Sequence, residues 1–553
     1  MPSYNTSDDK SQTPNLLAVW TTQLRNGITE GGEPSANAPL QKSDQEQLFR
    51  DVVLNVTTLA LSSLSGLIII PLLFHSVRRE LFGTWLIALA MAETATILNS
   101  GLGRSVVRET AQWAHSERGT RPGEFVSAAC WMFAALGVLG AVYITAAGRL
   151  VIARLSLPQE LQVDAHRLFV LVGARFFFEQ MTWFAFEALG GLRRFDKVSL
   201  VSISASLLRA ASFLTLMRIG TSMVALAVAD LCVACLVAAG GIVILGYAEP
   251  SYLRVRTILS WRQFLPQLRF GVTAQLASIC NMLVYDSAPF VIGLMRGAVA
   301  VVPFEIGQRV PSLLEKISWQ ASAAMFPAAA EYHQHREEER SAEVLRFGTR
   351  IVFVVVLPLC VVLSLLAPEF IGIWMRDVVP EAATVMRLLI FTMLLDAAAA
   401  TAFQVLWAQG RAGTVVLLVG TGGVLTVALS LLLIKPWAIV GCAAAIGAGV
   451  ALSGTGALLC ACQWLGENPI ALLKRAVRGT ALPTAASAAS ACIAKAGHFV
   501  QTWPSIVLVI ALASAVYLLG FLGLAADARE KEIIWNAVSY LLRGRTCRHR
   551  IHQ

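Results

Sequence analysis

Long apolar stretches recur along almost the whole chain, and no polar segment between them is large enough to form a soluble domain. Hydrophobic residues make up 56% of the 553 residues, charged residues make up 14%, and the mean hydropathy is +0.65. A helix needs about 20 apolar residues to cross a bilayer. The sequence therefore predicts an all-α, polytopic membrane protein with about 14 transmembrane helices, which begin near Asp51, Leu81, Pro122, Leu168, Val198, Met223, Phe270, Ala298, Ile351, Ala382, Thr414, Trp437, Gly479 and Trp503.

The basic residues gather in alternate loops. One set of loops, together with the C-terminal tail, holds 25 Lys and Arg residues, whereas the opposite set holds 10. Short loops rich in Lys and Arg stay on the cytoplasmic side of a membrane. The imbalance predicts that both termini are cytoplasmic. It also explains the net charge of +9 without a nucleic-acid partner.

An internal repeat divides the chain. Residues 185–198 align without gaps on residues 402–415, an offset of 217, and both segments end the fourth span of a six-span half. Because six is an even number, the two halves have the same orientation, as in a parallel repeat. We expect a disordered cytoplasmic tail (1–49), an N-lobe of spans 1–6 (50–248), a C-lobe of spans 7–12 (265–465), two extra C-terminal helices (478–526) and a basic cytoplasmic tail (527–553).

Polar side chains occur inside the seventh and eighth spans. A charge at the centre of a membrane costs about 2.5–3.5 kcal/mol on insertion scales, so such residues face a protein interior or a wet cavity. Helical spacing places the polar residues of each span on one face. We expect them to line a hydrated cavity for an anionic solute. The alternative is that Glu305 and Arg309 neutralise each other and hold two helices in register. The set is Gln275, Asn281, Asp286, Glu305, Arg309, Glu315 and Lys316.

The N-lobe carries a second set of buried charges. Arg175 and Glu179 lie one turn apart on the fourth span, and Glu93, Arg209 and Asp230 lie within the second, fifth and sixth spans. For each of them the alternative is a helix-to-helix pair. Taking both sets together, the predicted substrate-binding residues are Arg175, Arg209, Arg309 and Lys316, and the predicted ion-coupling or cavity residues are Asp286, Glu305, Glu179, Asp230, Gln275, Asn281 and Glu93.

Several functions lack the residues that they need. Cys232 and Cys235 have the spacing of half a zinc site, but no second Cys or His pair accompanies them, so no metal is expected. A nucleotide-binding loop of the type GxxxxGK[ST] is absent from the sequence, which argues against an ATPase. The longest predicted external connection, at residues 148–166, is too short for the catalytic loop of a polymerase or ligase. We therefore expect a transporter and not an enzyme, with no bound cofactor.

Five segments resemble polysaccharide transporters such as the Wzx-type O-antigen flippases. They are PLLF with RELFGTW (71–74, 79–85), NSGLGRSVVRE (99–109), FEALGGLRRFD (186–196), PFEIGQRVP (303–311) and AMFPAAAE (324–331). The resemblance covers roughly residues 51–465. The family belongs to the multidrug/oligosaccharidyl-lipid/polysaccharide exporter superfamily, whose members have two six-helix lobes and work by alternating access. Fourteen spans instead of twelve, and a longer polar N-terminal tail, depart from the usual pattern.

The resemblance implies a flippase in the bacterial inner membrane. Its expected cargo is an isoprenoid pyrophosphate that carries an oligosaccharide for lipopolysaccharide or exopolysaccharide, and its expected partners are membrane lipid, a polysaccharide polymerase and chain-length proteins. Expected energy sources are a proton gradient, a sodium gradient or the membrane potential. Two alternatives remain open at this point: a multidrug or cation antiporter of the same superfamily, and a lipid II flippase.

Overall fold

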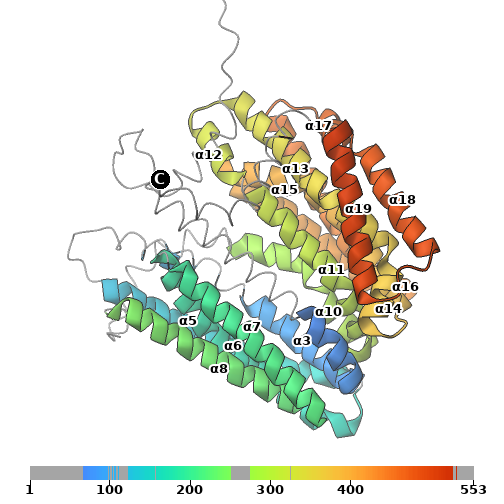
Figure 1. The fold of residues 1–553 in the computed structure, drawn as a ribbon. Coiled ribbons are helices and arrows are strands. Elements are labelled where there is room, and N and C mark those ends of the chain that lie inside the picture. The colour runs from blue at the N-terminus through green and yellow to red at the C-terminus, as the bar shows by residue number, and fades with distance from the viewer. Residues whose placement is uncertain are drawn as a thin grey trace, which may run out of the picture.

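The computed structural model describes residues 66–96, 99, 102–103, 105–107, 110, 122–155, 157–192, 194–250, 275–323, 325–526 and 531. The predicted N-terminal tail, the predicted starts of the first and seventh spans at Asp51 and Phe270, and the C-terminal tail apart from Lys531 lie outside the described residues. Within the described ranges every regular element is a helix (Figure 1), which confirms the all-α class.

Six described helices form the N-lobe: Gly66–Ser76, α3 (Arg79–Thr96), α5 (Pro122–Arg154), α6 (Gln159–Gly191), α7 (Phe195–Ile219) and α8 (Met223–Ala248). α6 packs against α3, α5 and α8, while α7 packs mainly on α8. Only 11% of the most apolar stretch of α7 is buried, so this helix lies at the lipid-facing side of the lobe.

The described helices of the C-lobe are Gln275–Tyr285, α10 (Ala288–Arg296), α11 (Ala298–Ala323), α12 (Phe326–Gln334), α13 (Glu338–Leu365), α14 (Ala367–Met375), α15 (Pro380–Ala408) and α16 (Ala412–Trp464). α15 lies at the centre of the lobe: 72% of its most apolar stretch is buried, and it packs against α11, α13 and α16. The seventh span is broken, because helix Gln275–Tyr285 and α10 meet at a bend of 45°.

α16 contains two predicted spans. Pro436 lies inside it, and Ala438 has a φ of 48°, so the helix is sharply bent there. The two arms of α16 then pack closely, because a Cβ added to Gly449 would lie 1.9 Å from the hydroxyl of Thr426 and 2.6 Å from the carbonyl oxygen of Gly422. Glycine is the residue that permits this approach.

The helix boundaries repeat along the chain. α6 ends at Gly191 and α7 begins at Phe195, while α15 ends at Ala408 and α16 begins at Ala412, so both boundaries recur after 217 residues. After α16 come α17 (Pro469–Val477), α18 (Ala481–Ala496) and α19 (Trp503–Leu524), of which the last two pack against each other and against α13.

Eight of the described helices are long and apolar enough to cross a membrane, or nine when the bent seventh span is counted as one. Each of the fourteen predicted spans nevertheless overlaps a helix. Fewer than fourteen helices meet the length and hydropathy expected of a span, for physical reasons. α16 holds two spans, α18 has only 16 residues, and the described part of the first span is Gly66–Ser76. α3 and α11 are less apolar, because they carry the charged residues described below.

The two lobes meet tightly at one end of the bundle, which we call the closed end. α3 packs there against α10 and α11, and a Cβ added to Gly83 would lie 1.9 Å from the carbonyl oxygen of Ala298. The indole Nε1 of Trp374 donates a hydrogen bond to the carbonyl oxygen of Leu67 at 2.6 Å. His75 also bonds to the carbonyl oxygen of Met375, and Arg79 pairs with Asp377 at 3.5 Å. From this end the lobes diverge (Figure 1).

Candidate functional site

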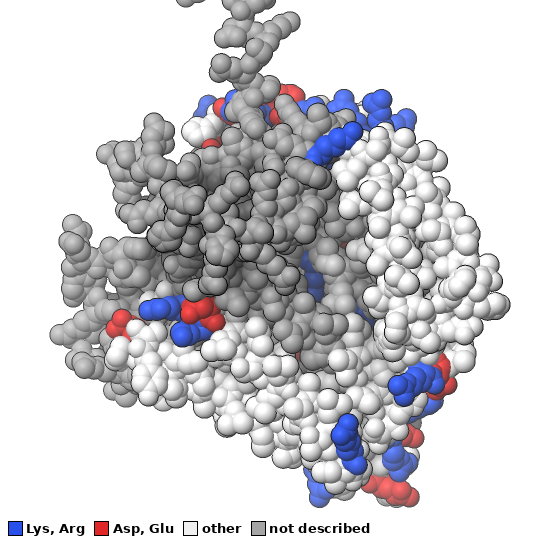
Figure 2. All heavy atoms as spheres, viewed as in Figure 1, with Lys and Arg blue, Asp and Glu red and all other residues white. Residues whose placement is uncertain are grey.

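A cavity of about 530 Å³ lies between the lobes. α3 supplies one wall, and helix Gln275–Tyr285, α10 and α11 supply the others. Lys and Arg side chains are visible inside the hollow that separates the two halves (Figure 2). Its lining residues are Leu86, Leu89, Ala90, Glu93, Asn281, Tyr285, Asp286, Pro289, Glu305, Gln308, Arg309, Ser312, Glu315, Lys316 and Trp319.

One face of α11 provides seven of these residues. Their numbers, 305, 308, 309, 312, 315, 316 and 319, follow the spacing of a single helical stripe. At 1.5 Å per residue the stripe extends over about 21 Å, roughly two thirds of the hydrocarbon thickness. The cavity therefore carries polar groups deep into the membrane-spanning part of the molecule.

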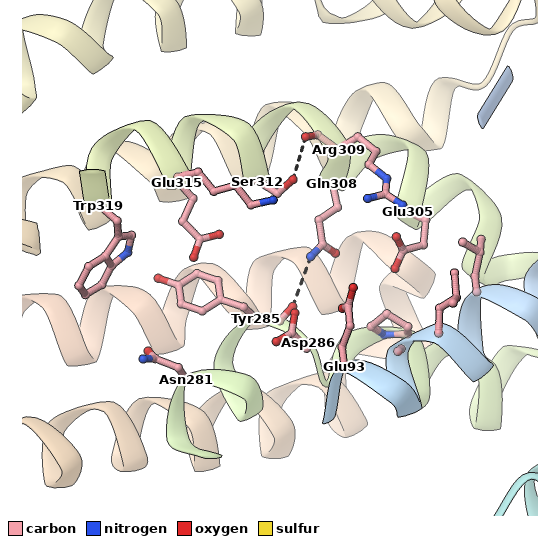
Figure 3. Close-up of a pocket in the computed structure, with 15 residues that line it drawn as sticks. Glu93, Asn281, Tyr285, Asp286, Glu305, Gln308, Arg309, Ser312, Glu315 and Trp319 are labelled. Atoms are coloured by element: carbon pink, nitrogen blue, oxygen red, sulfur yellow. Dashed lines mark hydrogen bonds between the residues drawn. The ribbon is translucent and has the colours of Figure 1, made fainter. Parts of the chain in front are cut away.

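The broken seventh span faces that stripe (Figure 3). The bend leaves carbonyl groups without their helical donors, and Nε2 of Gln308 donates to the carbonyl oxygen of Tyr285 at 3.3 Å. On the other side, the hydroxyl of Tyr285 donates to Oδ1 of Asp396 at 3.1 Å. Asp396 lies on α15 and is 2% exposed. The broken segment is thus held by α11 and by α15 at Tyr285, and the next residue, Asp286, lines the cavity.

The lining carries charges of both signs. Four carboxylates, those of Glu93, Asp286, Glu305 and Glu315, share the cavity with the two cations Arg309 and Lys316. Glu93 comes from the N-lobe and interacts electrostatically with both cations of the C-lobe. A change in the distance between the lobes therefore changes the electrostatic interaction of Glu93 with Arg309 and Lys316.

Two buried polar atoms beside the cavity have no hydrogen-bond partner within the described part of the chain, namely Nε of Arg309 and Oε1 of Gln308. A buried donor or acceptor without a partner costs about 1–3 kcal/mol, so a rearrangement that satisfies either atom is favourable. Both residues line the cavity, and together their side chains offer a charged donor and an amide group.

The N-lobe charges form a separate cluster next to the cavity. Nε of Arg175 lies 2.9 Å from Oδ2 of Asp230, and Nε of Arg209 donates to Oδ1 of the same carboxylate at 2.7 Å. Arg175 also donates to Glu179 at 2.6 Å. The side chains of Arg175 and Asp230 are 13% and 4% exposed. Glu93 interacts electrostatically with Arg175 and Glu179, so the cluster and the cavity share this residue.

The structure thus separates the predicted site residues into two groups. Asn281, Asp286, Glu305, Arg309, Lys316 and Glu93 line the cavity, whereas Arg175, Glu179, Arg209 and Asp230 hold α6, α7 and α8 together. Gln275 does not line the cavity and interacts elsewhere. The roles assigned to these residues, in substrate binding or ion coupling, stay predictions.

Of the seven lining residues on α11, four were absent from the predicted site residues, namely Gln308, Ser312, Glu315 and Trp319, although Glu315 was among the polar residues expected inside the span. All four lie on the α11 stripe: Gln308, Ser312 and Trp319 come three residues after Glu305, Arg309 and Lys316 respectively, and Glu315 directly precedes Lys316. Extending the helical periodicity from those charged residues would have found them. Tyr285 belongs to the polar face of the seventh span, but its bond to Asp396 depends on the packing of α15 and has no sequence signal.

Comparison with known proteins agrees with this architecture. The family model described as "Polysaccharide biosynthesis protein" matches residues 77–377, which is more than half of the chain and includes every cavity-lining residue. No curated protein sequence matches the chain.

Among solved structures, the lipid II flippase MurJ in an inward closed conformation is similar with a TM-score of 0.65 and 11% identity; the match covers 88% of this chain and 100% of MurJ. An inward-facing multidrug resistance MATE transporter of the MOP superfamily is similar with a TM-score of 0.61 and 15% identity, covering 75% of this chain and 96% of that one. A MOP superfamily transporter from Pyrococcus furiosus, reported for the reverse polarity of its binding pocket, has a TM-score of 0.51 and 15% identity over 77% and 94%.

At these identities the structural likeness establishes the fold, while the family model establishes the relationship. The chain belongs to the family of polysaccharide biosynthesis proteins, and it is a multi-pass membrane protein with the fold of the MOP superfamily transporters.

Proposed function

We propose that the protein flips a lipid-linked oligosaccharide, carried on an isoprenoid pyrophosphate, across the bacterial inner membrane. The observation that carries the proposal is the α11 stripe, where Arg309 and Lys316 face a cavity between the two lobes that also offers neutral hydrogen-bonding groups. The family relationship supports a role in polysaccharide biosynthesis.

The sugar part explains why the cavity is polar at membrane depth. Carrying hydroxyl groups through hydrocarbon without hydrogen-bond partners costs several kcal/mol for each group. Asn281, Gln308 and Ser312 provide donors and acceptors that replace water, and the carboxylates accept further hydroxyl protons. Trp319 at the end of the stripe offers an aromatic face on which a sugar ring packs. The isoprenoid tail needs no such partners and stays in the bilayer.

The pyrophosphate part suits the two cations. A guanidinium group binds phosphate oxygens in pairs through its planar fork, and an ammonium group adds a mobile point charge. Arg309 lines the cavity, and Lys316 lies two turns further along the same face of α11. Moving negative charge outward through an inside-negative potential gains about 2.3 kcal/mol per charge for each 100 mV. The membrane potential thus favours export of such a cargo, with or without a coupled proton or sodium ion.

The contacts between the lobes fit alternating access. The charge count along the loops predicts that the closed end faces the outside of the cell. In this conformation the cavity would then receive cargo from the cytoplasmic side, where the oligosaccharide is assembled. Opening to the outside requires the Trp374–Leu67, His75–Met375 and Arg79–Asp377 contacts to separate. Opening also requires α3 to move away from α10 and α11, which it packs against at the closed end.

A second candidate function is export of an organic cation. The observation that favours it is the excess of carboxylates over cations in the lining, four against two. A cationic drug would pair with Glu305, Glu315 or Asp286, whereas Arg309 and Lys316 would repel it. The two candidates therefore predict opposite effects when Arg309 is neutralised.

Complementation of a flippase-null strain tests the proposal. We expect Arg309→Ala to abolish surface polysaccharide at unchanged membrane abundance, because it removes the guanidinium group from the cavity. Arg387→Ala is the matched control: this exposed arginine of α15 donates to the carbonyl oxygen of Ser364 and does not line the cavity. Normal surface polysaccharide with Arg309→Ala would reject the proposal. Increased efflux of an organic cation by the same variant would favour the second candidate.

A further inference from the structure

A second polar feature lies far from the cavity, on the membrane-facing side of the N-lobe. Arg149 of α5, His166 and Arg167 of α6, and the first turns of α8 surround an open groove of about 680 Å³. Apart from these three cationic or titratable residues, the lining is aliphatic: Val163, Val170, Leu171, Val224 and Val228.

The groove lies where the headgroups of a bilayer leaflet would be. α5 and α6 each have 33 residues and are about 50 Å long, whereas the hydrocarbon core is about 30 Å thick, so this hairpin extends beyond it. Val224 belongs to the first turn of α8 and lines the groove together with Arg149. The cations are therefore level with the end of a neighbouring span, and the valines continue from there along the lipid-facing surface.

The charges of the groove are only partly compensated. Arg167 pairs with Asp164 at 3.1 Å, and both side chains are substantially exposed. An exposed pair of this kind contributes little to stability, so Arg167 can readily exchange Asp164 for another anion. The carbonyl oxygen of Gln162 lies 2.7 Å from Nδ1 of His166, which leaves Nε2 of the ring to another partner. Arg149 is exposed and carries a full charge next to the aliphatic floor.

We propose that this groove binds an anionic phospholipid. Its phosphodiester lies against Arg149 and Arg167, and one acyl chain lies along Val170, Leu171 and Val228. A phosphodiester presents the paired oxygens that guanidinium groups bind, and the aliphatic floor suits a hydrocarbon chain. The positive charge of the groove disfavours a cationic ligand, and its exposed valines disfavour a water-soluble one. The site is distinct from the cavity between the lobes, so its occupancy tests nothing about the flipped cargo.

Native mass spectrometry of the purified full-length protein tests the proposal. Phosphatidylglycerol and the zwitterionic phosphatidylethanolamine are added at equal concentration. We expect retention of one phosphatidylglycerol in preference to phosphatidylethanolamine, and a loss of about tenfold or more in the affinity for phosphatidylglycerol in Arg149→Gln/Arg167→Gln, because each charged hydrogen bond contributes about that factor. Arg154→Gln/Arg218→Gln is the matched control: it removes the same charge from helix ends of the same lobe outside the groove.

A second variant separates the acyl chain from the charge. Val170 is 50% exposed, so Val170→Trp fills the groove without disturbing the core or the net charge. We expect it to weaken retention of phosphatidylglycerol while the arginines remain. Equal retention of the two lipids by the wild type, or undiminished retention by the arginine variant, would overturn the proposal. Displacement of the lipid by inorganic phosphate alone, or preference for an isoprenoid pyrophosphate over phosphatidylglycerol, would also overturn it.

Discussion

Replacing Asp230 by asparagine tests the ion cluster of the N-lobe, because one carboxylate there holds two arginines. Its oxygens lie 2.9 Å from Nε of Arg175 and 2.7 Å from Nε of Arg209, so it joins three helices, α6, α7 and α8. Asparagine keeps the size of the side chain and removes its charge. The substitution therefore measures the electrostatic role of the carboxylate and creates no cavity.

The expected cost follows from the burial of the three side chains. Removing one partner of a buried ion pair costs about 3–5 kcal/mol, since the other charge is left without compensation. Asp230 is 4% exposed and Arg175 is 13% exposed, so their pair belongs to this class. Arg209 is 32% exposed and reaches solvent or headgroups, and Glu179 still pairs with Arg175. We therefore expect a destabilisation near the lower limit, about 3 kcal/mol.

Thermal unfolding of the detergent-solubilised protein measures this cost. The matched control is Asp164→Asn, which breaks the exposed pair with Arg167 and is expected to cost at most about 1 kcal/mol. Adding Arg209→Gln to Asp230→Asn removes one uncompensated cation and is expected to restore part of the lost stability. The reasoning is refuted if Asp230→Asn unfolds at the same temperature as Asp164→Asn.

Two further substitutions test the lobe interface and the broken span. A Cβ added to Gly83 would lie 1.9 Å from the carbonyl oxygen of Ala298, the first residue of α11, so we expect Gly83→Val to separate the closed end. A cysteine introduced at Ser312, in a cysteine-free background, should then react with an impermeant thiol reagent from outside, and absence of labelling would contradict this. Tyr285→Phe and Asp396→Leu each remove the hydrogen bond between these two side chains. In a double-mutant cycle their effects on stability should therefore be less than additive, by about 0.5–1.5 kcal/mol, whereas full additivity would show that the bond has no energetic role.

The helices of this protein follow closely from hydropathy, because the thickness of a bilayer fixes the length of a span. Met223, Ala298 and Trp503 were predicted as helix starts, and α8, α11 and α19 begin at these residues. α6 begins at Gln159 and not near Leu168, since its first turns are polar and extend beyond the hydrocarbon. Hydropathy does not register such an extension.

The cavity follows from the sequence only in part. Periodicity along α11 brings Glu305, Arg309 and Lys316 to one face, and this is a local property of a helix. The pairing of Arg175 and Arg209 with Asp230 is not local: it depends on how α6, α7 and α8 pack, and either role for these arginines was consistent with the sequence. Charges that share one helix face are thus predictable, whereas charges that meet across helices need the fold.

Translocation by the purified protein in liposomes is the most direct test of the proposed function. The liposomes contain an isoprenoid pyrophosphate oligosaccharide in the leaflet that faces the loops rich in Lys and Arg, and the arrival of its sugar in the opposite leaflet is followed by a lectin. We predict translocation by the wild type and by Arg387→Ala, and none above protein-free liposomes by Arg309→Ala/Lys316→Ala. Equal translocation by the double variant and the wild type, or none by the wild type, would contradict the account.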